Sequence, residues 1–391
     1  MRRGAADGVR RATGAGQVGG RPGLTLHRTP CRDGGRPVRA VVKQQHHRGD
    51  VMIRTAIAGL GWWGRTLVES IDGSALMTVV AAAQPRVSPE IDAFITARGL
   101  RHVASVDELA KDDGIEAVIL ATPPSGHAAE TTTLARAGKH VFCEKPFTYD
   151  KASAAAAAAA VEKAGVVLGI GFNRRFHPEM EKLRERIRSG GLGVLEHIEC
   201  IMTVPNALFM PKTAWRAKPE EAPCGALAPL GVHAIDAFIQ LAGEIETIYC
   251  QSTRRAVDLP TDDTTSALFR MKSGASAYLG MMMATAPAFV VQAYGSKGWV
   301  RLDGMTHVAG ASSEERRTGL FAECRFQPVQ GEAETWAADR VDTARVGLEA
   351  FARAAAGGPA FPVTPAEIVH GAAATEALIR SAATGQAQRV E

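Results

Sequence analysis

The segment AGLGWWGR (residues 58–65) contains three glycines in the spacing G-x-G-x-x-G, namely Gly59, Gly61 and Gly64. An apolar run precedes them, and residues 62–73 have the pattern of a helix. In such a strand–turn–helix the glycines permit a tight turn, close approach of a pyrophosphate and close helix–strand packing. The helix N-terminus offers N–H groups and a positive dipole end to the same anion. The segment therefore predicts a dinucleotide-binding turn.

The end of the second expected strand, LMTVVAAA (76–83), bears on which nicotinamide coenzyme would bind. An acid usually follows this strand and bonds the ribose 2′-hydroxyl. This chain has Gln84 there, with Arg86 two residues later. No carboxylate repels a 2′-phosphate and Arg86 could pair with one, so the sequence favours NADP. The alternative is that Gln84 bonds the ribose of NAD and Arg86 is a solvated loop residue.

Strands and helices alternate beyond the glycines, which predicts a parallel sheet with helices on both faces. After about residue 174 the pattern changes to short strands separated by turns, which predicts a mostly antiparallel sheet in an α+β domain. Residues 52–173 are therefore expected to form a Rossmann domain and 174–391 a substrate and oligomerisation domain. The segments expected to be helical at the end of the chain, 336–356 and 365–383, could pack back on the first domain.

Residues 1–51 form a basic, glycine-rich arm with a net charge of +8 and no hydrophobic periodicity. Such a segment buries too little apolar surface to fold, so we expect disorder. Twin arginines occur without an apolar stretch after them, which argues against an export signal. Our preferred hypothesis is that Met52 is the true start, because the first strand begins there. A nucleic-acid-binding arm is the alternative.

The rest of the chain carries a net charge of −4 without a basic stripe, so no nucleic-acid partner is expected. No apolar run approaches the length of a membrane span. Six cysteines are scattered without a C-x-x-C pair, which suits a reducing cytoplasm. No cluster has metal-ligand spacing, so no metal is expected.

Four further stretches, taken in order with the glycine turn, resemble the Gfo/Idh/MocA family of NAD(P)-dependent oxidoreductases. They are ATPPSGH (121–127), EKP (144–146), GFNRRFHP (171–178) and TAWRAKPEEAPCGALAPLGVHAID (213–236). The resemblance covers residues 52–391. It implies an α/β protein with an N-terminal Rossmann domain and a C-terminal α/β domain built on a large, mainly antiparallel sheet. In the family the open face of that sheet often makes the oligomer contact, so a homodimer or homotetramer is expected, with YLGMMMATA (278–286) on that face.

The resemblance also implies catalytic residues. Lys145 matches the lysine of the E-K-P motif and would hold the substrate oxygen, and Glu144 would orient this lysine or the nicotinamide ribose. Both residues are also expected to contact the coenzyme. His233 matches the catalytic histidine and has an ordinary pKa suited to proton transfer. The family pattern has an aspartate four residues before this histidine, and here that residue is Pro229. Asp236, three residues after His233, is expected to bind substrate and could partly substitute for the missing aspartate. The loss nevertheless puts standard polyol chemistry in doubt.

Further site residues are carried over from the family motifs. Asn173 and Arg174 are expected to line the active site, with one of Arg174 and Arg175 binding a carboxylate or phosphate and the other forming a structural ion pair. Trp215 and Arg216 are expected to lie over the coenzyme and pocket. The remaining coenzyme-binding predictions are Trp62, Trp63, Thr122, Pro123 and His127, the last more as a helix cap than a chemical group.

Together these features predict a cytoplasmic NAD(P)-dependent oxidoreductase. Its substrate would be the secondary alcohol or ketone of a small molecule such as a sugar, an inositol or a cyclic diol. One alternative is a lyase or epimerase that uses bound NAD without net redox. The other, suggested by Pro229, is a coenzyme-binding regulatory protein without turnover.

Overall fold

Six parallel strands form the first sheet of the structure, a computed structural model that describes residues 52–305 and 312–391. The order β3-β2-β1-β4-β5-β6 is the Rossmann arrangement that the sequence predicts. The strands are β1 (Ile53–Ala58), β2 (Met77–Ala83), β3 (Arg101–Val103), β4 (Ala117–Leu120), β5 (His140–Cys143) and β6 (Leu168–Ile170). The strand order reverses between β1 and β4, so their carboxyl ends flank the crevice where such sheets bind ligands.

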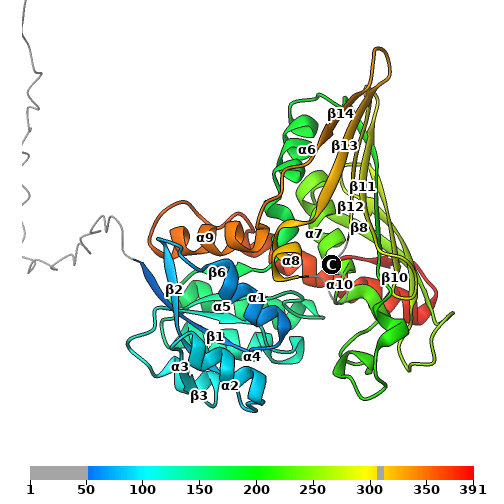
Figure 1. Cartoon of the computed structure of the whole chain (residues 1–391). Helices are drawn as coiled ribbons and strands as arrows, with labels where there is room; N and C mark the ends of the chain where they lie inside the picture. Colours follow the sequence, from blue (N-terminus) through cyan, green and yellow to red (C-terminus); the bar gives the residue numbers. More distant parts are fainter. Residues whose placement is uncertain (1–51, 306–311) are drawn as a thin grey trace, which may run out of the picture. The chain divides into compact units, whose positions relative to one another are not determined.

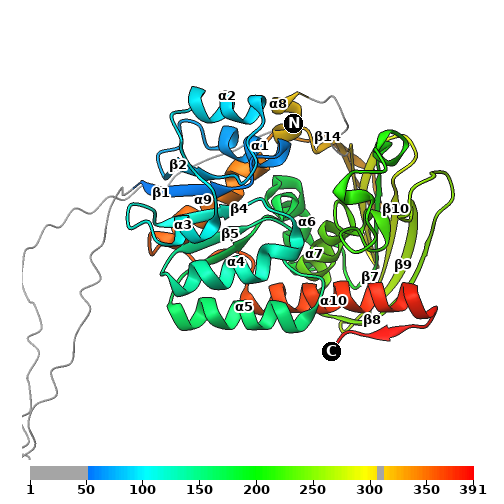
Figure 2. The same cartoon turned by 90° about the horizontal axis from the view of Figure 1, so that it is seen from below.

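Helices α1 to α5 connect these strands, and capping side chains set where several of them begin. They are α1 (Trp62–Ser70), α2 (Pro89–Ala97), α3 (Val106–Ala110), α4 (Pro124–Arg136) and α5 (Lys151–Ala164). Ser88, Ser105 and Asp150 each accept a hydrogen bond from the backbone N–H three residues later. Figure 2 shows α4 and α5 side by side on one face of the sheet, with α1 and α9 on the other.

A nine-stranded sheet dominates the second half of the chain, in the order β14-β13-β12-β11-β7-β10-β9-β8-β15. Only β7 and β10 pair in parallel, so the sheet is mainly antiparallel, as predicted. The strands are β7 (Leu195–Thr203), β8 (Ile245–Thr253), β9 (Thr264–Met271), β10 (Ser276–Met282), β11 (Ala288–Gly295), β12 (Gly298–Gly304), β13 (Phe321–Pro328), β14 (Glu334–Ala337) and β15 (Gln388–Arg389).

One face of this large sheet is covered by α6 (Pro178–Arg188) and α7 (Gly231–Ala242) (Figure 1). Side chains of β9 alternate: Ala267 and Phe269 lie in the core beneath the helices, whereas Leu268 points to the other face and is 54% exposed. Short 3₁₀ turns occur at η1 (Asn173–Phe176), η2 (Asn206–Phe209), η3 (Trp215–Ala217) and η4 (Gly225–Leu227). That the open face makes a subunit contact stays a prediction.

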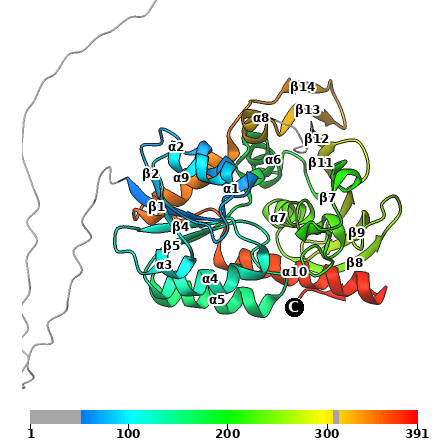
Figure 3. The same ribbon diagram turned by 60° about the horizontal axis from the view of Figure 1, so that its bottom comes forward.

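The last two long helices, α9 (Thr343–Ala355) and α10 (Pro365–Thr384), return to the first sheet. Phe351 of α9 is fully buried and meets Phe142 of β5 edge to face, with ring centroids 5.6 Å apart. Figure 3 shows α10 running alongside α5 and on toward the large sheet. The apolar core of the first sheet therefore contains residues from both ends of the described chain.

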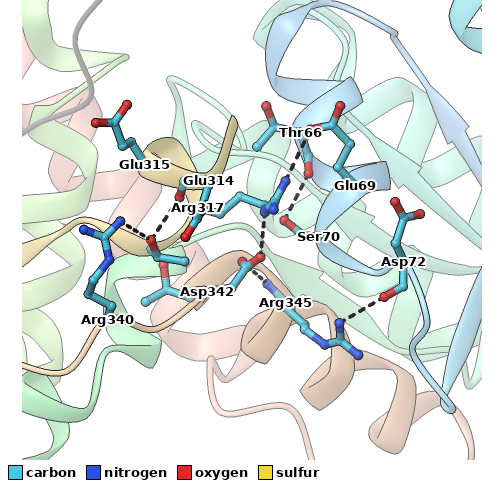
Figure 4. Close-up of polar contacts among 12 residues, drawn as sticks. Thr66, Glu69, Ser70, Asp72, Glu314, Glu315, Arg317, Arg340, Asp342 and Arg345 are labelled. Atoms are coloured by element: carbon cyan, nitrogen blue, oxygen red, sulfur yellow. Dashed lines mark hydrogen bonds and ion pairs between the residues drawn. The ribbon is translucent and has the colours of Figure 1, made fainter. Parts of the chain in front are cut away.

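A polar network joins the end of α1 to α8 (Ser313–Thr318) and to the start of α9 (Figure 4). The guanidinium of Arg317 lies 3.3 Å from Glu69 and 3.1 Å from Asp342. Asp342 accepts the backbone N–H of Arg345, whose side chain donates to the carbonyl of Asp72. These contacts fix the first turn of α9 against the first lobe.

The prediction of one helix over 336–356 is wrong at its start. Residues 334–337 form β14, and α9 begins only at Thr343. The indole N–H of Trp336 donates to Oε2 of Glu179 at 2.8 Å, and β14 pairs with β13. Tertiary contacts thus override the helix propensity of the alanine-rich sequence.

The predicted arm at residues 1–51 lies outside the described residues and stays a prediction. Within the described ranges, no helix combines the length and apolar character needed to cross a membrane. The same ranges contain no group of three or more His, Cys, Asp or Glu side chains placed to hold a metal ion.

Candidate functional site

The three glycines of the first turn have different surroundings. These surroundings match the tight turn, the close approach of a pyrophosphate and the close helix packing that the sequence predicts. Gly59 has φ of +91°, and a Cβ there would lie 2.6 Å from the carbonyl oxygen of Ala121. A Cβ on Gly64 would overlap the carbonyl oxygen of Gly59, so α1 packs directly against the turn. A Cβ on Gly61 would meet no atom within 4 Å, and Gly61 lines a cleft. The turn thus leaves bare backbone that a phosphate can approach.

The side chain of Gln84, which follows β2, hydrogen-bonds to the glycine turn. Its Oε1 accepts the N–H of Leu60 at 2.8 Å, and its amide nitrogen donates to the carbonyl of Arg86 at 2.9 Å. Gln84 lines the cleft, as predicted for a coenzyme contact. Arg86 is exposed and is not among the lining residues, so its present position does not support direct contact.

The two tryptophans of the turn occupy the first helical positions of α1. Both line the cleft, and their ring centroids are 5.4 Å apart at an interplanar angle of 64°. Trp62 is 43% exposed. A hydrogen bond from Trp63 favours the charged form of Glu144, so Trp63 reaches toward the end of β5.

The turn between β4 and α4 forms another wall of the cleft. Thr122 and Pro123 line it, and Thr122 donates to Oε2 of Glu130 at 2.5 Å. His127 does not line the cleft: it is buried behind it, with its ring nitrogens 2.9 Å from the carbonyl of Thr122 and 2.8 Å from that of Pro146. Burial lowers the pKa of His127. The prediction that His127 contacts the coenzyme directly is therefore not supported by its position. Its ring instead bonds two backbone carbonyls, which helps to hold the wall of the cleft in place.

Glu144 and Lys145 follow β5 at the carboxyl edge of the sheet, and the bond to Pro146 is cis. Both side chains line the cleft. Burial raises the pKa of Glu144 and lowers that of Lys145 to about 8, while the attraction between the two charges opposes both shifts. The positive charges of Arg174 and Arg216 lower the pKa of Lys145 further.

Lys145 connects the two lobes of the site. Its Nζ donates to the carbonyl of Pro229 at 3.1 Å and lies 3.5 Å from that of Ala228. Both carbonyls immediately precede α7, whose third residue is His233. The proline that lacks a carboxylate therefore still holds the lysine, through its backbone oxygen.

His233 lies in the first turn of α7, is 6% exposed and lines the same cleft. Its ring meets Phe172 edge to face with centroids 6.4 Å apart. The cleft has a volume of about 1120 Å³ and runs from the glycine turn to Lys145 and His233. The structure thus brings together the coenzyme turn and both predicted catalytic residues.

The two arginines after β6 have separate roles. Arg175 forms an ion pair with Asp236 at 2.6 Å, both side chains being 6% exposed, and a second with Glu367 at 3.0 Å. This pair removes Asp236 from the cleft, which corrects the prediction that it contacts substrate and leaves it no role in place of the missing aspartate. Arg174 instead lines the cleft, together with Asn173.

The loop before α7 completes the cleft. Arg216 lines it, and burial lowers the pKa of its guanidinium. The side chain of Trp215 lies outside the described part of the structure, so its predicted role stays a prediction. Sequence reasoning missed several apolar or amide residues of this wall, because nothing in their pattern distinguishes them from core residues: Val204, Asn206, Met210, Leu230 and Met283.

Comparison with known families gives two matches that follow one another along the chain. Residues 53–172 match the oxidoreductase family with an NAD-binding Rossmann fold, and residues 180–301 match the GFO/IDH/MocA C-terminal domain. Together the matches cover both lobes of the cleft.

Individual relatives agree with these matches. The rhizopine catabolism protein MocA of Rhizobium meliloti is 27% identical over 84% of this chain and 95% of its own length. The inositol 2-dehydrogenase of Rhizobium meliloti (strain 1021) is 32% identical, over 40% of this chain and 46% of its own length.

Solved structures share the fold. The aldose-aldose oxidoreductase of Caulobacter crescentus has a TM-score of 0.75 at 22% identity, covering 87% of this chain and 100% of that one. An oxidoreductase domain protein from Kribbella flavida has a TM-score of 0.75 at 19% identity, with 87% and 99% covered.

Proposed function

Because the chain belongs to the Gfo/Idh/MocA oxidoreductase family, we propose that it moves a hydride between a nicotinamide coenzyme and a secondary alcohol or ketone. The substrate would be a sugar, an inositol or a cyclic diol, or a close derivative. One observation supports the proposal: Lys145, a half-buried cation on the coenzyme lobe, donates a hydrogen bond to Pro229 just before the helix that carries His233, and both side chains line one cleft.

The cleft fits a dinucleotide. Gly61 leaves space over the backbone, and the N-cap position of α1 carries no capping side chain, so the helix N-terminus can accept a pyrophosphate. The far end is bordered by Pro85 and Ser105, at the ends of β2 and β3, where the adenosine would lie. The bound nicotinamide would supply the hydride acceptor or donor.

Lys145 would hold the reacting oxygen. Its pKa of about 8 keeps it mainly protonated at neutral pH, so its N–H groups can stabilise an alkoxide as negative charge develops on that oxygen. The carbonyls of Ala228 and Pro229 orient the ammonium without neutralising it. Glu144 supplies a buried carboxyl beside it, which helps to set the lysine pKa.

His233 would take the hydroxyl proton during oxidation and return it during reduction. Its place in the first turn of α7 puts it on the lobe opposite the coenzyme. Phe172 packs against its ring, which restricts ring orientation. The missing aspartate means that His233 has no carboxylate one helical turn before it, so its basicity depends on the surrounding cleft.

The coenzyme preference we propose is NADP. The described residues place no carboxylate at the end of β2, and Gln84 is already hydrogen-bonded to the turn. Arg86 is exposed and, among the described residues, no carboxylate forms an ion pair with it, so it can swing toward a 2′-phosphate. Replacement of Arg86 by Ala should raise KM for NADPH about tenfold and leave KM for NADH unchanged. Equal changes for both coenzymes would contradict this preference.

The test of the function combines binding with turnover. Titration of the protein with NADH and NADPH, followed by coenzyme fluorescence, should show saturable binding. Absorbance at 340 nm with a panel of polyols and keto-sugars should then show turnover that Lys145→Met abolishes, while the variant still binds coenzyme saturably. Full activity of Lys145→Met would refute the role of the lysine, and absent binding of both coenzymes would refute the function.

A further inference from the structure

Arg174 is a buried cation without a carboxylate partner among the described residues. Its side chain is 7% exposed, its guanidinium lies 4.4 Å above the ring of Phe289, and its Nη1 donates to Sδ of Met202 at 3.5 Å. These two partners come from β11 and β7 of the large sheet. The adjacent Arg175, equally buried, has two carboxylate partners. The chain therefore neutralises one of two neighbouring arginines and leaves the other facing the cleft.

The position of Arg174 separates it from the coenzyme phosphates. It follows β6, at the crossing between lobes, and reaches under the large sheet, whereas the phosphates belong at the glycine turn of β1 and α1. An aromatic ring and a thioether are weak partners for a desolvated guanidinium. A negative group bound in the cleft would offset that cost.

The charges lining the inner end of the cleft are unbalanced. Lys145, Arg174 and Arg216 are cationic there, and Glu144 is the one carboxylate beside them among the described residues that line it. The other lining acids, Asp107 and Glu130, lie on α3 and α4 at the coenzyme end. Pro229 contributes only a carbonyl where the family motif has an aspartate, so nothing at that position reduces the positive charge.

We propose that the substrate carries a carboxylate bound by Arg174, next to the carbinol whose oxygen Lys145 holds. The substrate class is then a hydroxy acid or sugar acid and its keto counterpart, and this inference rests on the proposed function. In the oxidation, the carbinol carbon loses a hydride to the nicotinamide and the hydroxyl loses its proton to His233. A C=O bond forms and the carboxylate is unchanged.

The geometry favours a carboxylate over a phosphate. The contact with the ring of Phe289 and the bond from one guanidinium nitrogen to Met202 restrict how the Arg174 side chain lies. The remaining N–H groups lie in the guanidinium plane, which matches the two coplanar oxygens of a carboxylate. A phosphate dianion is commonly bound by several backbone N–H groups at a helix N-terminus, whereas Arg174 offers the N–H groups of a side chain.

The test compares acids with neutral analogues on the NADPH-loaded protein. Calorimetry would measure binding of gluconate against sorbitol and of glycerate against glycerol. Activity would be followed with the same compounds and the oxidised coenzyme, NADP+, which accepts the hydride. We expect each acid to bind about tenfold tighter or more than its neutral analogue. Arg174→Met should reduce this ratio to about threefold or less. Methionine fills similar volume and removes a buried charge, so the variant should fold, which its urea midpoint would check.

Two more variants sharpen the result. Arg186 also stacks on an aromatic ring, 4.0 Å above Phe326, but lies outside the cleft, so Arg186→Met should keep the wild-type preference. Pro229→Asp adds a carboxylate beside Lys145 and should weaken gluconate binding more than sorbitol binding.

Several outcomes would overturn the inference. They are equal binding of acids and neutral analogues, an acid preference that survives Arg174→Met, tighter binding of glycerol 3-phosphate than of glycerate, and no binding of any acid. In each of these cases the protein would still bind NADPH. Failure to bind either nicotinamide coenzyme would instead overturn the proposed function, so the two failures are distinguishable.

Discussion

Gly61 and Gly64 allow coenzyme binding and folding to be tested separately within one turn. Alanine at Gly61 adds a methyl group into open space, and φ of −61° there suits any residue. Alanine is a poorer N-cap than glycine, which lowers stability, but it also reduces the conformational entropy of the unfolded chain, which raises stability. Because the two effects oppose each other, we expect the free energy of unfolding to change by less than about 0.5 kcal/mol. The methyl group would occupy the surface that the pyrophosphate approaches, so the Kd for coenzyme should rise about 10- to 100-fold, or about 1.4–2.8 kcal/mol.

Alanine at Gly64 should have the opposite profile. Its Cβ would overlap the carbonyl oxygen of Gly59, which is backbone and cannot rotate away. The start of α1 must then move, and overpacking of this kind costs about 1–3 kcal/mol. Because the moved helix carries the phosphate site, coenzyme affinity should fall as well.

Both effects are measurable by urea unfolding followed by tryptophan fluorescence and by NADPH titration. Gly371→Ala is the matched control: the Cβ added in α10 would meet only Ile239 at 3.8 Å, so stability should rise by about 0.5–1 kcal/mol with coenzyme Kd unchanged. Unchanged coenzyme affinity in Gly61→Ala would refute the placement of the pyrophosphate over this turn. A wild-type urea midpoint in Gly64→Ala would refute the packing argument.

Three further predictions concern charged groups. The ammonium of Lys145 loses its proton as pH rises through about 8, so kcat/KM should fall above pH 8. A profile with no fall between pH 8 and pH 10 would contradict this. Asp236→Asn leaves Arg175 buried with Glu367 as its remaining carboxylate partner, so the free energy of unfolding measured in urea should fall by about 3 kcal/mol. A free energy of unfolding equal to that of the wild type would show that the ion pair is dispensable for stability. Arg317→Ala removes a half-buried bridge and should lower the free energy of unfolding by about 1 kcal/mol, without changing KM for either coenzyme.

The first lobe could be predicted from the sequence because its signals are local. The glycine spacing, the capping residues Ser88 and Asp150, and alternation of apolar strands with helices each depend on residues near one another in the chain. The second lobe could be predicted only in outline. The edge strand β15 forms through pairing with β8, a segment distant in sequence, which single-sequence patterns do not record.

In the site, too, residues within local motifs could be predicted, whereas contacts between distant parts of the chain could not. Motif position was enough to bring Lys145 and His233 into one cleft. It could not tell which arginine of the pair after β6 is neutralised, because Asp236 and Glu367 lie 61 and 192 residues from Arg175 in sequence. Nor could it show that the backbone oxygen of Pro229 holds the lysine, since a carbonyl is present at every position.

The return of α9 to the first sheet constrains how the protein is made. Leu348 and Phe351 complete an apolar core most of whose other members belong to the strands and helices from β1 to β6. The first lobe therefore completes its core only after α9 has been synthesised, and the apolar face that α9 covers stays exposed until then. For the same reason, a chain that stops just before Thr343 would lack part of the apolar core of the first lobe and should destabilise that lobe.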